Sequence, residues 1–400
     1  MLGPEGLIVT PLFLFAALSL VAWIALCGFR GGFWRANQTL ARDVGERKEW
    51  PGVVAIIPAR NEGDVIGEVI TSHMRCGYPG PFSVLLVDDH SQDNTIEAAL
   101  AAAESWERRL EVVEAPPLAN WWTGKLSALN HGFEIAQEKF PEAEFVLFTD
   151  ADIVHGSDVL SRLVDKAESD QTSLVSVMAL LDTKGFWGSF LIPAFVFFFQ
   201  KLYPFKWVND PENSTAAAAG GCMLVKMDVM QEVGGFAPIH GELIDDCALA
   251  RLIKENPPKR AIWLCFSRSV RSLRPYSGLD DIWDMVVRTA YTQLRFSPPL
   301  LAGTVAGMMV LYLTAPLIAL TVGLHGEIIS AAIGLVVWII MSLAYAPTLQ
   351  IYGESPLGGI LLPVKAALYT AMTVSSAMRY NKGEGGGWKG RTFPTPLKLG

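Results

Sequence analysis

Two kinds of apolar segment occur along this chain: short runs separated by amphipathic stretches, and long runs without charge. The short runs are almost continuously apolar, which is typical of strands covered on both faces of a sheet. They predict strands at 53–58, 83–88, 110–115, 144–149 and 173–180. Apolar residues at helical spacing predict helices between them, at 62–75, 95–106 and 124–140. This order predicts an α/β domain over residues 50–275, with a mostly parallel, Rossmann-like central sheet and helices on both faces.

The long apolar runs predict transmembrane helices. Residues 7–29 carry no charge, and a run of this length is enough to cross a bilayer as a helix. No Lys or Arg precedes them, so residues 1–30 are interpreted as a retained N-terminal anchor and not as a cleaved signal peptide. Two further uncharged runs, 299–323 and 328–349, are also long enough to span.

Three other apolar stretches are ambiguous. Residues 356–378 contain a proline and a lysine, so they either span, re-enter or lie at the interface, and the membrane region 299–378 has two or three spans. The aromatic stretch 186–203 is short for a span and is predicted to be an interfacial helix, with a buried core helix as the alternative. Residues 279–297 have apolar and basic faces at helical spacing, which predicts an amphipathic helix along the membrane surface.

Composition agrees with a membrane-bound protein and excludes some partners. The chain has 400 residues, of which 51% are hydrophobic, more than an ordinary soluble enzyme contains. The net charge is −8 and no basic stripe is visible, so no nucleic-acid partner is expected. The five cysteines are scattered without metal-ligand spacing, which fits a reducing compartment.

Basic residues predict the orientation of the chain. Those after the anchor place the domain in the cytoplasm by the positive-inside rule: Arg30, Arg35, Arg42, Arg47 and Lys48. The Gly- and Pro-rich tail, 379–400, is also basic, which favours the cytoplasm. If the N-terminus is outside and the chain crosses the membrane four times, however, the tail would also be outside. The side of the membrane on which the tail lies is therefore not decided by the sequence.

Acidic residues follow the predicted strands at the points where the strands end. The sequences there are PARNE (58–62), VDDHSQD (87–93) and TDAD (149–152). Because the carboxyl ends of parallel strands meet at one edge of a sheet, the acids are expected to converge there: Asp88, Asp89, Asp150 and Asp152. Like charges at one site require compensation, and a divalent cation bound to carboxylates and phosphate oxygens would supply it.

Each of these residues also has a structural interpretation. An aspartate after a strand is often a helix cap or an Asx-turn, and for Asp93 this interpretation is favoured. Lys125 before a helix could meet phosphates, a carboxylate or only solvent. The adjacent Trp121 and Trp122 could stack on a base or a sugar, or pack the loop. In GELIDDCALA, Asp245 and Asp246 could cap a helix, or one of them could be a general base.

Taken in order, six stretches resemble a family 2 glycosyltransferase of the GT-A fold: IIPARNE, LLVDDHSQDNT, TGKLSALNHG, LFTDADIVH, AAGGCMLVKMDVMQEVGGF and LIDDCALA. They cover roughly residues 53–250. The anchor and the late spans are similar to membrane-bound lipid glycosyltransferases, including ceramide glucosyltransferase-like enzymes. In length and in VVRTAYTQLRFSPPLL the chain looks most like the hopene-associated glycosyltransferases of bacterial hopanoid loci.

The resemblance implies roles for individual residues. The donor nucleotide would contact the residues Pro58, Arg60, Asn61, Glu62, Asp88, Asp89, Lys125 and Asp150. Asp150 and Asp152 would form the Asp-x-Asp motif, with Asp152 the more direct ligand of Mg²⁺ or Mn²⁺. Asp246, in the pair Asp245–Asp246, would deprotonate the acceptor. In TQLRF, Arg295 would steady the diphosphate, while Thr292 and Phe296 replace the Gln and Trp of the family motif.

The resulting prediction is an inverting, nucleotide-sugar-dependent transferase of the hexosyltransferase type in the bacterial inner membrane. Its catalytic domain would be cytoplasmic and its acceptor a membrane lipid, with a hopanoid-related lipid as the narrower expectation. The two alternatives are an elongating polysaccharide synthase, which the departures from the TQLRF motif put in doubt, and a non-catalytic membrane scaffold.

Overall fold

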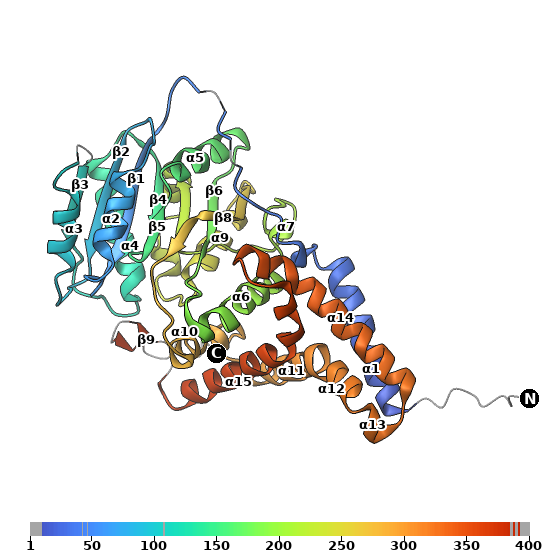
Figure 1. Ribbon diagram of the computed structural model, residues 1–400. Helices are drawn as coiled ribbons and strands as arrows, with labels where there is room; N and C mark the ends of the chain where they lie inside the picture. The colour runs from blue at the N-terminus through green and yellow to red at the C-terminus, as the bar shows by residue number, and fades with distance from the viewer. Residues whose placement is uncertain are drawn as a thin grey trace, which may run out of the picture. The chain divides into compact units, whose positions relative to one another are not determined.

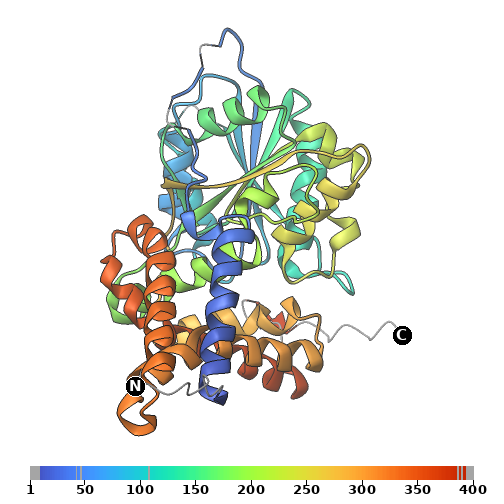
Figure 2. The same ribbon diagram turned by 90° about the vertical axis from the view of Figure 1, so that its right-hand side faces the viewer.

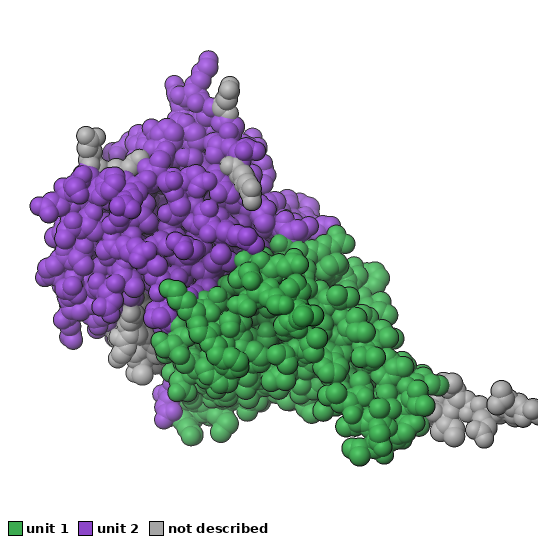
Figure 3. All heavy atoms as spheres, in the orientation of Figure 1, with its two compact units in different colours: residues 1–36, 183–204, 276–382 green, residues 37–182, 205–275, 383–400 purple. Residues whose placement is uncertain are grey.

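The computed structural model describes residues 10–41, 43–45, 47–106, 109–384, 387–388 and 391–392 (Figure 1). The predictions for residues 1–9, for Arg42 and for most of the tail after residue 384 lie outside them. The chain divides into two compact units (Figure 3). We call residues 37–182, 205–275 and 383–400 the sheet unit, and residues 1–36, 183–204 and 276–382 the helical unit.

The sheet unit is built on an eight-stranded sheet, which Figure 2 shows nearly edge-on. The strands are β1 (Gly52–Ala59), β2 (Phe82–Asp88), β3 (Arg109–Glu114), β4 (Ala143–Thr149), β5 (Ile153–His155), β6 (Leu174–Leu180), β7 (Cys222–Lys226) and β8 (Ile262–Ser272). Their order is β3-β2-β1-β4-β7-β6-β8-β5. The pairs along β3-β2-β1-β4 and the pair β6-β8 are parallel, whereas β7 and β5 pair antiparallel with their neighbours. The sheet is therefore mixed.

Helices cover both faces of this sheet, as predicted. The helices are α2 (Ile66–Met74), α3 (Thr95–Ala103), α4 (Gly124–Lys139), α5 (Val159–Ser169), α7 (Phe205–Val208), α8 (Met227–Glu232) and α9 (Asp245–Glu255). Alternate residues of β1, such as Ala55 and Ile57, share a core with α2, α3 and α5. Ile56 points the other way, toward α4, where a Cβ on Gly132 would lie 2.6 Å from it. Glycine at this position lets α4 approach the sheet closely.

The five predicted strands all form, with shifts of a residue or two at their ends. The predicted helix 62–75 begins only at Ile66, because the backbone before it is bound by the loop after β2. Among the described strands, β5, β7 and β8 of this sheet were not predicted, and neither were the two-residue strands β9 (Gly387–Trp388) and β10 (Arg391–Thr392), which pair with each other. The chain from 183 to 204 lies inside the predicted domain 50–275 but packs within the helical unit.

The helical unit contains α1 (Pro11–Phe29), α6 (Gly185–Leu202), α10 (Leu279–Gln293), α11 (Pro298–Met308), α12 (Ala315–Leu320), α13 (Val322–His325), α14 (Ile328–Ile351) and α15 (Leu362–Asn381). A π-helical stretch, Met309–Thr314, joins α11 to α12. It lies just before Pro316, whose ring cannot continue the regular α-helical bonding. Close packing of α14 on α12 depends on Gly334, where a Cβ would lie 2.5 Å from the carbonyl oxygen of Ala315.

Five helices of the described chain are long and apolar enough to cross a membrane: Pro11–Phe29, Gly185–Leu202, Pro298–Leu320, Ile328–Ile351 and Pro356–Asn381. The predicted anchor and the two predicted late spans are among them. The predicted amphipathic segment 279–297 is a helix from Leu279 to Gln293. Whether this helix and α6 lie at a membrane surface stays a prediction.

Candidate functional site

The loops that follow β1 and β2 are bound to each other at the carboxyl edge of the sheet. The Arg60 guanidinium lies 3.8 Å from the carboxylate of Asp89 and donates to its carbonyl oxygen. Asn61 has a left-handed backbone (φ 51°); its N–H donates to Ser91 Oγ at 2.9 Å, and its side-chain oxygen accepts from the N–H of Gln92 at 2.8 Å. The sequences PARNE and DDHSQDN therefore form one structural element.

Asp93 completes this element. Its carboxylate accepts hydrogen bonds from the N–H of Thr95 at 3.1 Å and from the N–H of Gly63 at 2.9 Å. A Cβ on Gly63 would lie 2.2 Å from the side chain of Asn94, so a larger residue does not fit. The structural interpretation of Asp93, as a residue that fixes the start of α3, is confirmed.

Asp88 is a buried acid at this edge of the sheet, as is Asp89. Asp88 ends β2 and is 3% exposed, and its Oδ2 accepts from the N–H of Ser91 at 3.0 Å. Its Oδ1 is buried and has no hydrogen-bond partner among the described residues. A buried acceptor without a donor costs free energy, so this oxygen is suited to a ligand that carries an N–H or O–H group.

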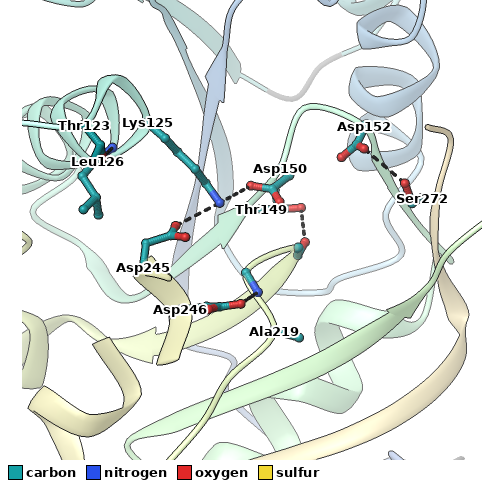
Figure 4. A network of polar contacts seen from close by, with 12 residues as sticks. Thr123, Lys125, Leu126, Thr149, Asp150, Asp152, Ala219, Asp245, Asp246 and Ser272 are labelled. Carbon is teal, nitrogen blue, oxygen red and sulfur yellow. Dashed lines mark hydrogen bonds and ion pairs between the residues drawn. The ribbon is translucent and has the colours of Figure 1, made fainter. Parts of the chain in front are cut away.

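A second group of charges lies at the end of β4 (Figure 4). Lys125, in the first turn of α4, is 2.8 Å from the carboxylate of Asp150 and 3.0 Å from that of Asp245, the first residue of α9. Burial alone would lower the pKa of Lys125, but the two carboxylates outweigh burial and raise it, so the amine stays protonated. Lys125 thus joins three elements that are distant in sequence.

Asp152 lies on the far side of the same turn (Figure 4). Its Oδ2 accepts a hydrogen bond from the Ser272 hydroxyl at 3.1 Å, at the end of β8. Burial and the charge of Glu62 raise the pKa of Asp152, and the charge of Arg274 lowers it in part. Burial also raises the pKa of Asp150, where Asp152 and Asp245 add to the effect and Lys125 opposes it. Burial is thus the main reason why the pKa values of both acids are raised.

Asp246 is held by backbone groups at the start of α9. Its two carboxylate oxygens accept from the N–H of Gly220 at 2.9 Å and of Cys247 at 2.7 Å. A Cβ on Gly220 would lie 3.3 Å from the Lys125 amine and 3.5 Å from Asp246, so both side chains flank this glycine. Burial, with the charge of Asp245, raises the pKa of Asp246 to about 6. A carboxyl group poised near neutral pH can accept a proton in catalysis.

Comparison with known proteins relates this arrangement to a family. Residues 54–234 match the family model described as "Glycosyl transferase family 2". This segment is therefore similar to family 2 glycosyltransferases. A curated relative of it, "Probable glycosyltransferase YdaM" from Bacillus subtilis (strain 168), is 34% identical over 128 residues. The match covers 30% of this chain and 30% of that protein, so the chain spans about a third of the relative's length.

A solved structure supports the fold of the glycosyltransferase domain. Mannosyltransferase PcManGT from Pyrobaculum calidifontis, solved in complex with GDP-Man and Mn²⁺, superposes with a TM-score of 0.51 at 19% sequence identity. The superposition covers 91% of this chain and 98% of that one. The predicted GT-A fold is confirmed, and the sequence matches support the predicted glycosyltransferase class of this segment.

The structure gives the following neighbours to the predicted acids. Asp88 and Asp89 contact Ser91 and Arg60, while the charges of Asp152 and Asp245 act on Asp150 and that of Glu62 acts on Asp152. Pro58 lies within β1, next to these loops. Arg295 belongs to the helical unit, where it is exposed in the turn after α10 with φ 51°. The roles of all these residues stay predictions.

Three residues beside the acids were missed by sequence reasoning. Ser272 and Arg274 reach the turn at Asp152 from β8, and Gly220 separates Lys125 from Asp246. For Gly220 a signal existed, since the stretch AAGGC was part of the resemblance. For Ser272 no local signal exists, because only the antiparallel pairing of β5 with β8 brings it to the site.

Proposed function

We propose that this chain is an inverting glycosyltransferase that moves a sugar from a nucleotide-sugar donor to a hydroxyl group of a membrane lipid. The observation that carries this function is the juxtaposition around Gly220. A carboxylate poised near neutral pH, Asp246, flanks this glycine together with Lys125, which is bound to Asp150 at the end of β4. This is an acid–base group beside a highly charged strand end, as a transfer from a diphosphate would need.

The nucleotide would bind in the joined loops after β1 and β2. Asp88 Oδ1 offers a buried acceptor with no donor among the described residues, which suits an N–H group of a base. Asp89 would contact the ribose, and Arg60 holds Asp89 in place through its carboxylate and its carbonyl oxygen. The backbone from Pro58 to Glu62 would line the pocket. The GDP-Man in the complex of the archaeal mannosyltransferase supports a donor of this class.

A divalent cation, Mg²⁺ or Mn²⁺, fits the turn at Asp150–Asp152. The two carboxylates lie two residues apart at the end of β4, and carboxylate oxygens are hard ligands. Within the described residues no group of three or more His, Cys, Asp or Glu side chains could hold a metal. Asp150 is engaged by Lys125, so Asp152 would be the main protein ligand and diphosphate oxygens would complete the shell. When bound, the cation neutralises the charge that develops on the diphosphate.

Asp246 would act as the general base. The backbone N–H groups of Gly220 and Cys247 fix the orientation of its carboxylate. Asp246 takes the proton of the acceptor hydroxyl while the oxygen forms its bond to the sugar carbon and the bond to the diphosphate breaks. A single displacement of this kind inverts the configuration at that carbon. Arg274 would add positive charge for the departing diphosphate. The role of Arg295, in the helical unit, stays a prediction.

A lipid acceptor is supported by the apolar helices of the helical unit. We place the sheet unit in the cytoplasm of a bacterium, at the inner membrane, because basic residues follow α1. Helix α15 packs along the amphipathic α10 through Trp283–Ser375 and Arg379–Asp284 contacts. This packing supports an interfacial or re-entrant α15 and a cytoplasmic tail. A hopanoid-related lipid is the narrower proposal for the acceptor.

Donor hydrolysis by the purified chain tests this function. Wild type is expected to hydrolyse at least one member of a panel of GDP- and UDP-sugars faster with Mn²⁺ than with EDTA, and Asp152→Asn to lose most of this activity. Asp228→Asn is the matched control, since Asp228 is an exposed acid in the first turn of α8. Equal, negligible turnover by wild type and Asp152→Asn would favour the scaffold alternative. Lipid analysis of a deletion strain would then identify the missing glycolipid, whereas a missing polysaccharide would favour the synthase alternative.

A further inference from the structure

The end of β8 holds Asp152 by both its backbone and its side chain. The N–H of Leu273 donates to the carbonyl oxygen of Asp152 at 2.7 Å, and Ser272 Oγ donates to its carboxylate at 3.1 Å. The pairing of β5 with β8 sets this contact, because it places Ile153 opposite Ser272. The carboxylate therefore cannot rotate without breaking a hydrogen bond.

The direction of the Ser272 hydroxyl is itself fixed. A serine hydroxyl has one hydrogen to donate and two lone pairs. One lone pair accepts from the N–H of Arg274 at 3.2 Å, which leaves the hydrogen directed to Asp152. Ser272 is 7% exposed, so water has little access to compete for this bond.

We propose that Ser272 is a positioning residue: it orients the carboxylate of Asp152 for the divalent cation, and thereby sets the affinity of the donor site for that cation. This inference rests on the proposed function, since it takes Asp152 as the metal ligand. Partners that hydrogen-bond to metal ligands typically contribute about 10- to 100-fold in metal affinity. We expect an effect near the lower limit, because Ser272 orients a single carboxylate.

Direct measurement of Mn²⁺ binding tests the inference. The full chain is titrated with Mn²⁺ in the presence of GDP or UDP, and free Mn²⁺ is followed by its EPR signal. Ser272→Ala should weaken Mn²⁺ binding by about tenfold, and Ser272→Thr, which keeps the hydroxyl, should restore it. Ser272→Cys has nearly the size of serine but only a weak S–H donor, so it should resemble Ser272→Ala even if the alanine variant folds poorly.

Ser267→Ala is the matched control. Ser267 is also buried in β8, and its hydroxyl accepts from the N–H of Ser269, away from Asp152. Wild-type Mn²⁺ affinity in both Ser272→Ala and Ser272→Cys would overturn the inference and leave the proposed function intact, as would equal losses in the Ser267 and Ser272 variants. If wild type binds no Mn²⁺ and turns over no donor, the proposed function fails and this inference with it.

Discussion

Removal of the Lys125 amine should destabilise the sheet unit and should do so most at high pH. In Lys125→Met the carboxylates of Asp150 and Asp245 would face each other without a cation. The side chains of Lys125, Asp150 and Asp245 are 20%, 34% and 16% exposed, so the pairs are neither fully buried nor at the surface. Loss of one partner of a buried pair costs about 3–5 kcal/mol, and exposed pairs contribute about 0–1 kcal/mol.

For this intermediate burial we expect a loss of about 2–3 kcal/mol. For a unit of this size, that corresponds to a decrease of about 4–12 °C in Tm. Thermal unfolding of the detergent-solubilised protein, followed by near-UV circular dichroism, measures it. The deficit should shrink as pH falls, because the pKa of Asp150 is already raised and protonation removes the uncompensated charge.

Two comparisons make the reasoning on Lys125 refutable. Lys139→Met breaks a contact with Glu111 in which the lysine is 40% exposed, so it should cost no more than about 1 kcal/mol. The double variant Lys125→Met/Asp150→Asn should recover part of the loss, because one of the unpaired carboxylates is gone. If Lys125→Met is no less stable than Lys139→Met, or if the double variant is less stable than Lys125→Met, the electrostatic explanation is wrong.

Two further predictions concern catalysis and packing. The pKa of Asp246 is about 6, so kcat/KM should be constant above this pH and fall tenfold per pH unit below it, as the base becomes protonated. Asp246→Asn should lose about 10²–10⁴-fold in rate, and its kcat/KM should lack this decrease at acidic pH. An unchanged decrease in the variant would exclude Asp246 as the base. Gly132→Ala should lower the free energy of unfolding by about 1–3 kcal/mol, because its Cβ would lie within 2.8 Å of both Ile56 and Val87. Gly303→Ala is the control, since nothing lies within 4 Å of its new Cβ. Equal effects of the two substitutions would contradict the packing argument.

The first half of the sheet could be predicted because its strands carry their own signal. β1, β2 and β4 are short runs of buried apolar residues, separated by helices with clear periodicity. Because these strands are parallel, the position of the acids at the carboxyl edge of the sheet could also be predicted. β8 begins with a short apolar run, IWLCF, that was not interpreted as a strand, and its second half, SRSVRS, is charged or polar except for Val270. β7 is only five residues long and follows an alanine-rich loop.

The candidate site was predictable as far as it consists of strand ends. The apolar run of β4 predicted the position of Asp150 and Asp152 at a strand end. Their partners, Lys125 and Ser272, belong to distant parts of the chain. Lys125 was expected to meet phosphates, a carboxylate or only solvent, and the structure pairs it with the carboxylates of Asp150 and Asp245. Ser272 lies 120 residues from Asp152, so only long-range strand pairing reveals it.

The sheet topology also limits how α6 can lie in a membrane, although its composition alone is that of a membrane span. α6 is long and apolar enough to cross a bilayer, yet the strands before and after it share one sheet, since β6 pairs with both β7 and β8. A helix that crossed once would separate these strands by a membrane, so both ends of α6 must lie on the same side. We therefore expect single cysteines at Lys184 and Lys206, which are both exposed, in a cysteine-free background, to react with an impermeant thiol reagent from the same side of membrane vesicles. A spin label at Phe186, which is 69% exposed, should report a shallow depth in the bilayer if α6 is interfacial. Labelling of the two cysteines from opposite sides would show that α6 crosses, and the shared sheet would then be wrong.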